Sequence, residues 1–149
     1  MRSPTLIIII SLLTFNLTLI AGESPKINEF VKCEISVKQK SMKAGATGEL
    51  LISLKPKDGI HINLDPPLTL KLDSSVAYLL VGKPIFSKTN KSEYIDIAKP
   101  IKQSFTLSKK IKPGLVQLKG TLSYFYCSGS DGWCARFKQP IDISVKVIQ

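Results

Sequence analysis

Alternation of apolar and polar residues is the main pattern along most of the chain. In residues 30–38 every second position from Val31 to Val37 is apolar, and charged or polar residues stand between them. Residues 76–82 form a more continuous apolar run, which indicates a strand buried on both faces. The other segments with a two-residue period, or with short apolar runs between turn residues, are 48–55, 68–73, 101–107, 115–126 and 141–147.

Turn residues separate these segments at a spacing typical of antiparallel sheets. The sequence PKDG at 56–59 and the pair Pro113-Gly114 each predict a turn. A 3.6-residue apolar period with helix caps is not found, so we expect little or no helix. Seven or eight short strands with these turns predict an all-β protein, an immunoglobulin-like antiparallel β-sandwich in a single domain. Residues 83–94 instead predict a long loop, and long loops in compact domains are often functional.

The first 22 residues have the layout of a secretory signal peptide. Arg2 precedes an apolar stretch from Leu6 to Ile20, and small residues follow that stretch. The stretch is short for a membrane span, and retention as an uncleaved anchor is the alternative. We therefore expect residues 1–22 to be removed on export, leaving residues 23–149 as a domain that is not embedded in the membrane.

The formal net charge of +10 raises the question of an anionic partner. Almost all of the positive charge comes from lysines spread along the chain, with the densest run at 109–112. The chain lacks the arginine-rich pattern with interleaved aromatic residues that is typical of nucleic-acid binding. We interpret the lysines as solvated residues on strand faces and edges, and we expect no nucleic-acid partner.

Strand parity places two of the three cysteines on the outer face. Cys127 has the opposite parity to the apolar position Tyr126, and counting back from Ile141 places Cys134 on the outer face as well. The residues between the cysteines include two glycines, which suit a tight hairpin loop. Neighbours across such a hairpin lie close enough for a disulfide, and disulfides persist in exported proteins.

Three roles are open for this pair: a structural staple, a redox centre, or part of a metal site with His61. A disulfide across so short a loop is worth roughly 2.5 kcal/mol, against about 5 kcal/mol for a bridge from the first strand. An outward disulfide is also accessible to an attacking thiolate, which narrowly favours redox activity over a staple. The spacing C-x6-C is not usual for zinc, so we expect no metal and no cofactor, and interpret His61 as a structural histidine.

Residues near the pair are expected to adjust its reactivity. Arg136 favours a thiolate at this position, whereas Asp131 opposes it, and we count Arg136 and Trp133 as modulating residues. The third cysteine, Cys33, has the parity of the apolar face of its strand. It is therefore expected to be a buried, free thiol.

Several segments resemble the N-terminal periplasmic domain of the DsbD thiol:disulfide interchange reductase family. The resemblance is most specific in LSYFYCSGSDGWCARFKQPIDISVKV, residues 122–147, where that family has a redox cysteine pair on an antiparallel hairpin. GIHINLDPPLTLKL at 59–72 resembles its HIN region, and IFSKTNKSEYID at 85–96 lies where the family has a cap loop over the disulfide. The resemblance extends over about residues 27–147.

This resemblance implies an immunoglobulin-like fold, a periplasmic location and a catalytic pair formed by Cys127 and Cys134, with Cys134 favoured as the attacking thiol. It implies thioredoxin-like or disulfide-bearing periplasmic partners and a membrane electron donor in trans. Phe86 or Tyr94 is then expected to contact the disulfide as part of a movable lid. The alternative is a secreted immunoglobulin-like interaction module whose hairpin disulfide is purely structural.

Overall fold

A computed structural model of the chain describes residues 27–89 and 93–149. The signal peptide predicted for residues 1–22 lies outside the described residues, as do positions 90–92 of the predicted loop. The described residues form nine strands: β1 (Val31–Val37), β2 (Met42–Lys43), β3 (Thr47–Pro56), β4 (Ile60–Ile62), β5 (Thr69–Leu72), β6 (Tyr78–Ile85), β7 (Ile101–Leu107), β8 (Gly114–Ser128) and β9 (Cys134–Ile148).

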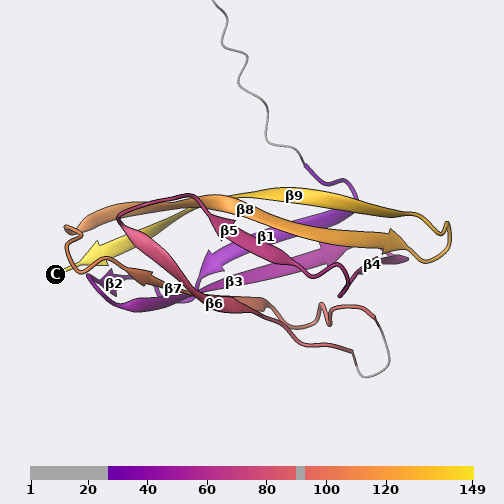
Figure 1. Ribbon diagram of the computed structural model, residues 1–149, viewed down its shortest axis with the longest axis horizontal. Helices are drawn as coiled ribbons and strands as arrows, with labels where there is room; N and C mark the ends of the chain where they lie inside the picture. Colours follow the sequence, from indigo (N-terminus) through magenta and orange to yellow (C-terminus); the bar gives the residue numbers. More distant parts are fainter. Residues whose placement is uncertain (1–26, 90–92) are drawn as a thin grey trace, which may run out of the picture.

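The strands form two sheets that pack against each other in an elongated sandwich (Figure 1). One sheet has the order β1-β3-β7-β6, and the other has the order β2-β9-β8-β4, with β5 also paired to β8. Neighbouring strands run antiparallel, except that β2 pairs in parallel with the end of β9. The prediction of an all-β antiparallel sandwich is confirmed, while its immunoglobulin-like assignment stays a prediction. Neither described range contains a helix, so neither contains a helix that could cross a membrane.

Two clusters of buried apolar side chains fill the space between the sheets. The first lies toward the β8–β9 hairpin and includes Ile62, Tyr124 and Tyr126. The second lies toward the opposite end of the sandwich and includes Leu50 and Phe105. The alternating burial in β3, β7 and β8 matches the two-residue period of the sequence, because successive side chains of a strand point to opposite faces.

The prediction of a strand buried on both faces at 76–82 is wrong. The strand there is β6, which begins at Tyr78, continues to Ile85, and pairs only with β7 at the edge of its sheet. Its outward side chains are exposed, as the 71% exposure of Leu79 shows, because no further layer covers that face. The predicted loop at 83–94 correspondingly begins later, since its first three residues belong to β6.

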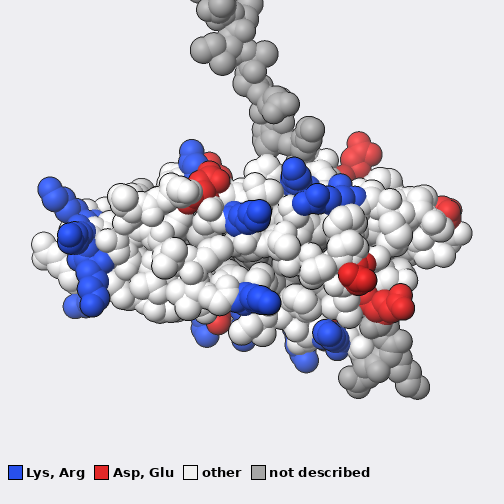
Figure 2. Space-filling view, in the orientation of Figure 1, with Lys and Arg blue, Asp and Glu red and all other residues white. Residues whose placement is uncertain are grey.

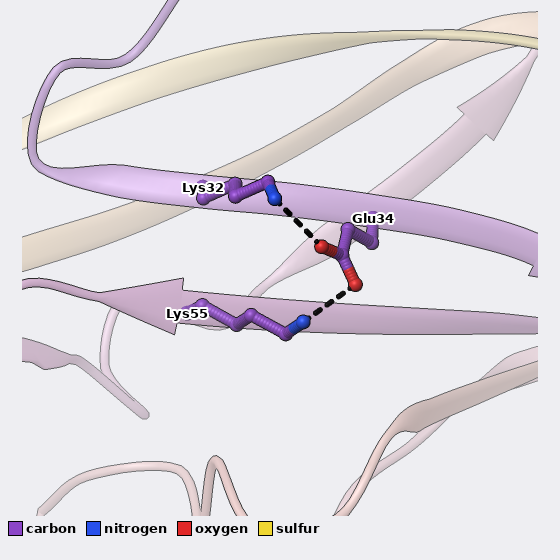
Figure 3. A network of polar contacts seen from close by, with 3 residues as sticks. All are labelled: Lys32, Glu34 and Lys55. Atoms are coloured by element: carbon purple, nitrogen blue, oxygen red, sulfur yellow. Dashed lines mark hydrogen bonds and ion pairs between the residues drawn. The ribbon is translucent and has the colours of Figure 1, made fainter.

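Three charged residues form a cluster on strands β1 and β3 of the four-stranded sheet. Lys32 and Lys55 lie 3.0 Å and 2.6 Å from the two carboxylate oxygens of Glu34 (Figure 3). The hydrogen bond from Lys55 and then that from Lys32 lower the pKa of Glu34. On the face that Figure 2 shows, basic side chains lie at the end of the sandwich where the chain terminates and along the middle, and most acidic side chains lie in the half with the β8–β9 hairpin.

Candidate redox site

A disulfide joins Cys127, near the end of β8, to Cys134, the first residue of β9. The two residues are direct partners across the hairpin, with Cα atoms 4.1 Å apart. The β8–β9 register runs without a shift from Gly114 opposite Val147 to this pair. The side-chain parity assumed from the sequence therefore holds along both strands, and the disulfide lies on the face opposite to the core residues of β8.

The loop between the cysteines is held by its own hydrogen bonds. The Ser128 hydroxyl donates to the Asp131 carboxylate at 2.8 Å and accepts from the Asp131 amide at 3.2 Å. The Ser128 amide donates to the Trp133 carbonyl oxygen at 2.9 Å. Gly132 has a φ of 68°, a left-handed conformation that favours glycine. These contacts close the hairpin tightly beside the disulfide.

The two sulfur-bearing residues differ in exposure. Cys127 is only 8% exposed, whereas Cys134 is exposed. Cys127 lies in an interior strand, between β9 on one side and β4 on the other. Cys134 lies at the sheet edge, because β2 reaches only Val147 and Ile148 of β9. An outward, accessible disulfide was predicted, but accessibility is concentrated on one of its two residues.

His61 is the neighbour of Cys127 on the side away from Cys134. It is the direct partner of Cys127 in the β4–β8 pairing, so the three side chains form one row on one face of the sheet. From the sequence, His61 was considered beside the cysteines only as a metal ligand and was interpreted as structural, and β4 was not predicted as a strand. The alternation Ile60-His61-Ile62 was the available signal, because two buried isoleucines direct the histidine to the outer face.

The imidazole of His61 stacks on one aromatic ring and lies near the hairpin loop. Its ring lies 4.5 Å from the ring of Tyr94 at an interplanar angle of 15°. On the hairpin side, a Cβ placed on Gly129 would lie 3.4 Å from the His61 Nε2 atom. His61 and Tyr94 also line a cavity of about 420 Å³ together with Ile97. In the part of the chain that the structure describes, no group of three His, Cys, Asp or Glu side chains could hold a metal ion.

Arg136 and Trp133 lie on opposite faces of the hairpin. The Arg136 guanidinium carbon lies 5.7 Å from the centre of the Phe125 ring, on the same outer face as the disulfide. The Trp133 indole packs toward the core, with its centre 5.0 Å from the Phe30 ring and 5.8 Å from the Tyr126 ring. Arg136 therefore lies on the face where a cysteine thiolate would form, and Trp133 anchors the hairpin to the core. Their effects on the reactivity of the cysteines stay predictions.

The two candidate lid residues have different surroundings. Phe86 is half-buried and packs against the core cluster near the hairpin. Tyr94 stacks on His61 and forms an isolated bridge with Asn63, beside β4. Contact of either residue with the disulfide stays a prediction.

The third cysteine, Cys33, is separate from this site. It is a free thiol on β1, in the other sheet, and it is half-buried against the core cluster. Burial, and then the charge of Glu34, raise the pKa of Cys33 to about 11. The thiol is therefore protonated at neutral pH, and a thiol is a poor nucleophile in that form.

Comparison of the sequence with protein-family models and with curated proteins finds no match. The similarity to the DsbD family is therefore carried by the sequence segments named above, and membership of that family stays a prediction.

Proposed function

We propose that this domain exchanges thiols and disulfides with other exported proteins through the Cys127–Cys134 pair. The observation that carries this proposal is the unequal exposure of the two residues. An incoming thiolate must reach one sulfur along the axis of the bond, and the other sulfur must be able to leave. Cys134 at the sheet edge offers that access, while Cys127 is held in the sheet interior. The partners are periplasmic thioredoxin-like or disulfide-bearing proteins, with a membrane electron donor in trans.

In the reduced domain, the Cys134 thiolate attacks a partner disulfide and forms a mixed disulfide. The electron pair of the broken bond leaves on the partner's second sulfur. Cys127 then attacks the Cys134 sulfur, which re-forms the Cys127–Cys134 bond and releases the partner as a dithiol. Two electrons pass to the partner in each cycle, and a donor dithiol returns them by the reverse sequence.

The contribution of the disulfide to stability supports exchange over a purely structural staple. Closing so short a loop restricts the unfolded chain by only roughly 2.5 kcal/mol. The hairpin is already held by the continuous β8–β9 register and by the Ser128–Asp131 hydrogen bonds. Because the disulfide contributes little to the stability of its own hairpin, thiol–disulfide exchange is the better explanation for its presence.

We expect a mild dithiol to open the disulfide without unfolding the domain. The reduction potential should be distinctly more oxidising than about −300 mV, the level below which structural disulfides resist glutathione. Equilibration with glutathione buffers, followed by intact-mass analysis and circular dichroism, measures both quantities. A potential below that level, or loss of the β signal together with reduction, would instead favour a secreted interaction module with a structural disulfide.

We also propose that Tyr94 belongs to a lid over the site. Replacing Tyr94 with alanine should accelerate reduction by glutathione severalfold with little change in melting temperature, since shielding is lost rather than core packing. The matched variant Phe86→Ala should lower the melting temperature and leave the rate unchanged, because Phe86 packs against the core. If Tyr94→Ala lowers stability and leaves the rate as it was, Tyr94 is not part of a lid.

A further inference from the structure

We infer, on the basis of the proposed exchange function, that His61 is a positioning residue for Cys127. As an imidazolium it stabilises the Cys127 thiolate when the disulfide is opened. From the sequence, His61 was interpreted as a structural histidine, and the exchange steps proposed above do not use it. Its place in the β4–β8 pairing gives it this further role.

The backbone geometry brings the two side chains together. The Asn63 amide donates to the Phe125 carbonyl oxygen at 3.0 Å, and the Gly129 amide donates to the Gly59 carbonyl oxygen at 3.0 Å. These bonds flank the His61–Cys127 pair by two residues on each side. In an antiparallel ladder, this spacing makes the pair a hydrogen-bonded one, with Cα atoms about 5.5 Å apart and side chains on the same face.

The imidazole contacts groups beside the site and still reaches water. Tyr94 stacks on the ring, and the Nε2 atom lies toward Gly129 of the hairpin loop. His61 is exposed, so its ring can exchange protons with solvent, whereas Cys127 is buried beside it. A thiolate formed at Cys127 is poorly hydrated in that position, and an adjacent cation then stabilises it more strongly.

Other charged groups surround these two side chains. Asp131 is engaged by the Ser128 hydroxyl at 2.8 Å, and Asp96 lies 4.0 Å from Lys99. Histidine is the residue type whose charge ordinarily changes between about pH 5 and 8, so we assign the pH-dependent contribution to His61. Titratable or charged residues on the neighbouring elements include Arg136 and Lys138 on β9, Asp131 in the hairpin loop, Lys57 and Asp58 before β4, Asp65 after β4, and Lys88, Glu93, Tyr94 and Asp96 in the segment from 86 to 100.

The role of His61 fits a balanced exchange step. A donor thiolate attacks the Cys134 sulfur, and the electron pair of the disulfide leaves on Cys127, whose thiolate pairs with the His61 imidazolium. The second donor thiolate attacks the donor sulfur of the mixed disulfide and releases Cys134, which takes a proton from water. The donor leaves as a disulfide, and the domain has gained two electrons and one proton, which Cys134 carries, while the Cys127 thiolate stays paired with the His61 imidazolium.

The test is a pH titration of the reduced Cys134→Ser domain by the ultraviolet absorbance of the thiolate. Cys33 is silent below about pH 9, since its pKa is about 11. We expect the Cys127 thiolate to appear at least about one pH unit lower than in the Cys134→Ser/His61→Gln double variant, a tenfold change in acid dissociation. The control Cys134→Ser/Lys138→Gln changes a charge farther along the same face and should leave the titration unchanged.

A second measurement needs no substitution of the histidine. His61 is the only histidine in the chain, so its ring protons can be followed directly by NMR. Its titration midpoint should be higher in reduced Cys134→Ser, where a thiolate can form beside it, than in Cys127→Ser. Equal midpoints, or a thiolate titration that His61→Gln does not move, overturn the inference. Neither titration involves a partner, so failure here is distinct from failure of the exchange function, which the reduction potential tests.

Discussion

A Cys127→Ser domain is expected to accumulate as a stable mixed disulfide with its partners. A Cys134→Ser domain should form at least about a hundredfold less of this mixed disulfide. The physical reason is access. Cys134 lies at the sheet edge and can reach a partner sulfur, but Cys127 is only 8% exposed between β4 and β9. Without Cys127, the mixed disulfide on Cys134 has no neighbouring thiol to resolve it, since Cys33 lies in the other sheet.

Non-reducing electrophoresis of proteins from the native host, with free thiols rapidly blocked, measures this difference. Cys33→Ser is the matched control, because it also removes one thiol from the chain but lies in the other sheet. It should neither trap a partner nor prevent exchange. Equal trapping by the Cys127→Ser and Cys134→Ser variants would show that exposure does not select the attacking residue. The absence of any mixed disulfide would count against exchange itself.

Replacing Phe105 with alanine is expected to lower the free energy of unfolding by about 3 to 5 kcal/mol. Phe105 is fully buried in the core cluster at the end of the sandwich away from the hairpin. Its ring packs directly on the backbone at Gly48, where an added Cβ would lie 2.6 Å from the Phe105 Cζ atom. Truncation leaves a cavity that this rigid neighbour cannot fill. The equilibrium of the disulfide with glutathione should stay unchanged, because the disulfide lies at the end of the sandwich with the other cluster.

Urea denaturation of the oxidised domain gives the unfolding free energy, and glutathione equilibration gives the redox equilibrium. Leu115→Ala is the surface control: Leu115 is 78% exposed, and its truncation should change stability by less than about 0.5 kcal/mol. A parallel shift of stability and redox equilibrium in Phe105→Ala would mean that the two ends of the sandwich are coupled. The disulfide would then depend on the whole core rather than on its own hairpin.

We expect the stability of the domain and the reactivity of the disulfide to respond to different substitutions, because different faces of the hairpin carry them. The cysteines and Arg136 lie on the outer face of the β8–β9 hairpin, while Trp133 anchors the same hairpin on the core side. Substitutions on the outer face can therefore change reactivity with little effect on packing. A substitution of Trp133 should instead affect both reactivity and packing, since its indole contacts Phe30 and Tyr126.

The sequence by itself determined the all-β class, most of the strands and the face on which the two cysteines lie. These features are local. Alternation has a period of two residues, so the parity of Cys127 relative to Tyr126 is decided within one strand. The pairing of Cys127 with Cys134 follows from a short loop with glycines, and the unshifted register of the hairpin kept that parity intact. The inward parity of Cys33 was decided in the same way, by its own strand.

Only the tertiary structure decided which strands lie side by side, and this decided the chemistry of the site. β4 has only three residues, and their alternation does not indicate which strand they pair with. Its pairing with β8 buries Cys127 and brings His61 beside it, while the short β2 leaves Cys134 at an open edge. The exposed face of β6 has the same origin, since alternation within a strand does not show whether a neighbour will cover it. Such long-range pairings depend on the free edges left by every other strand, and that information is spread over the whole chain.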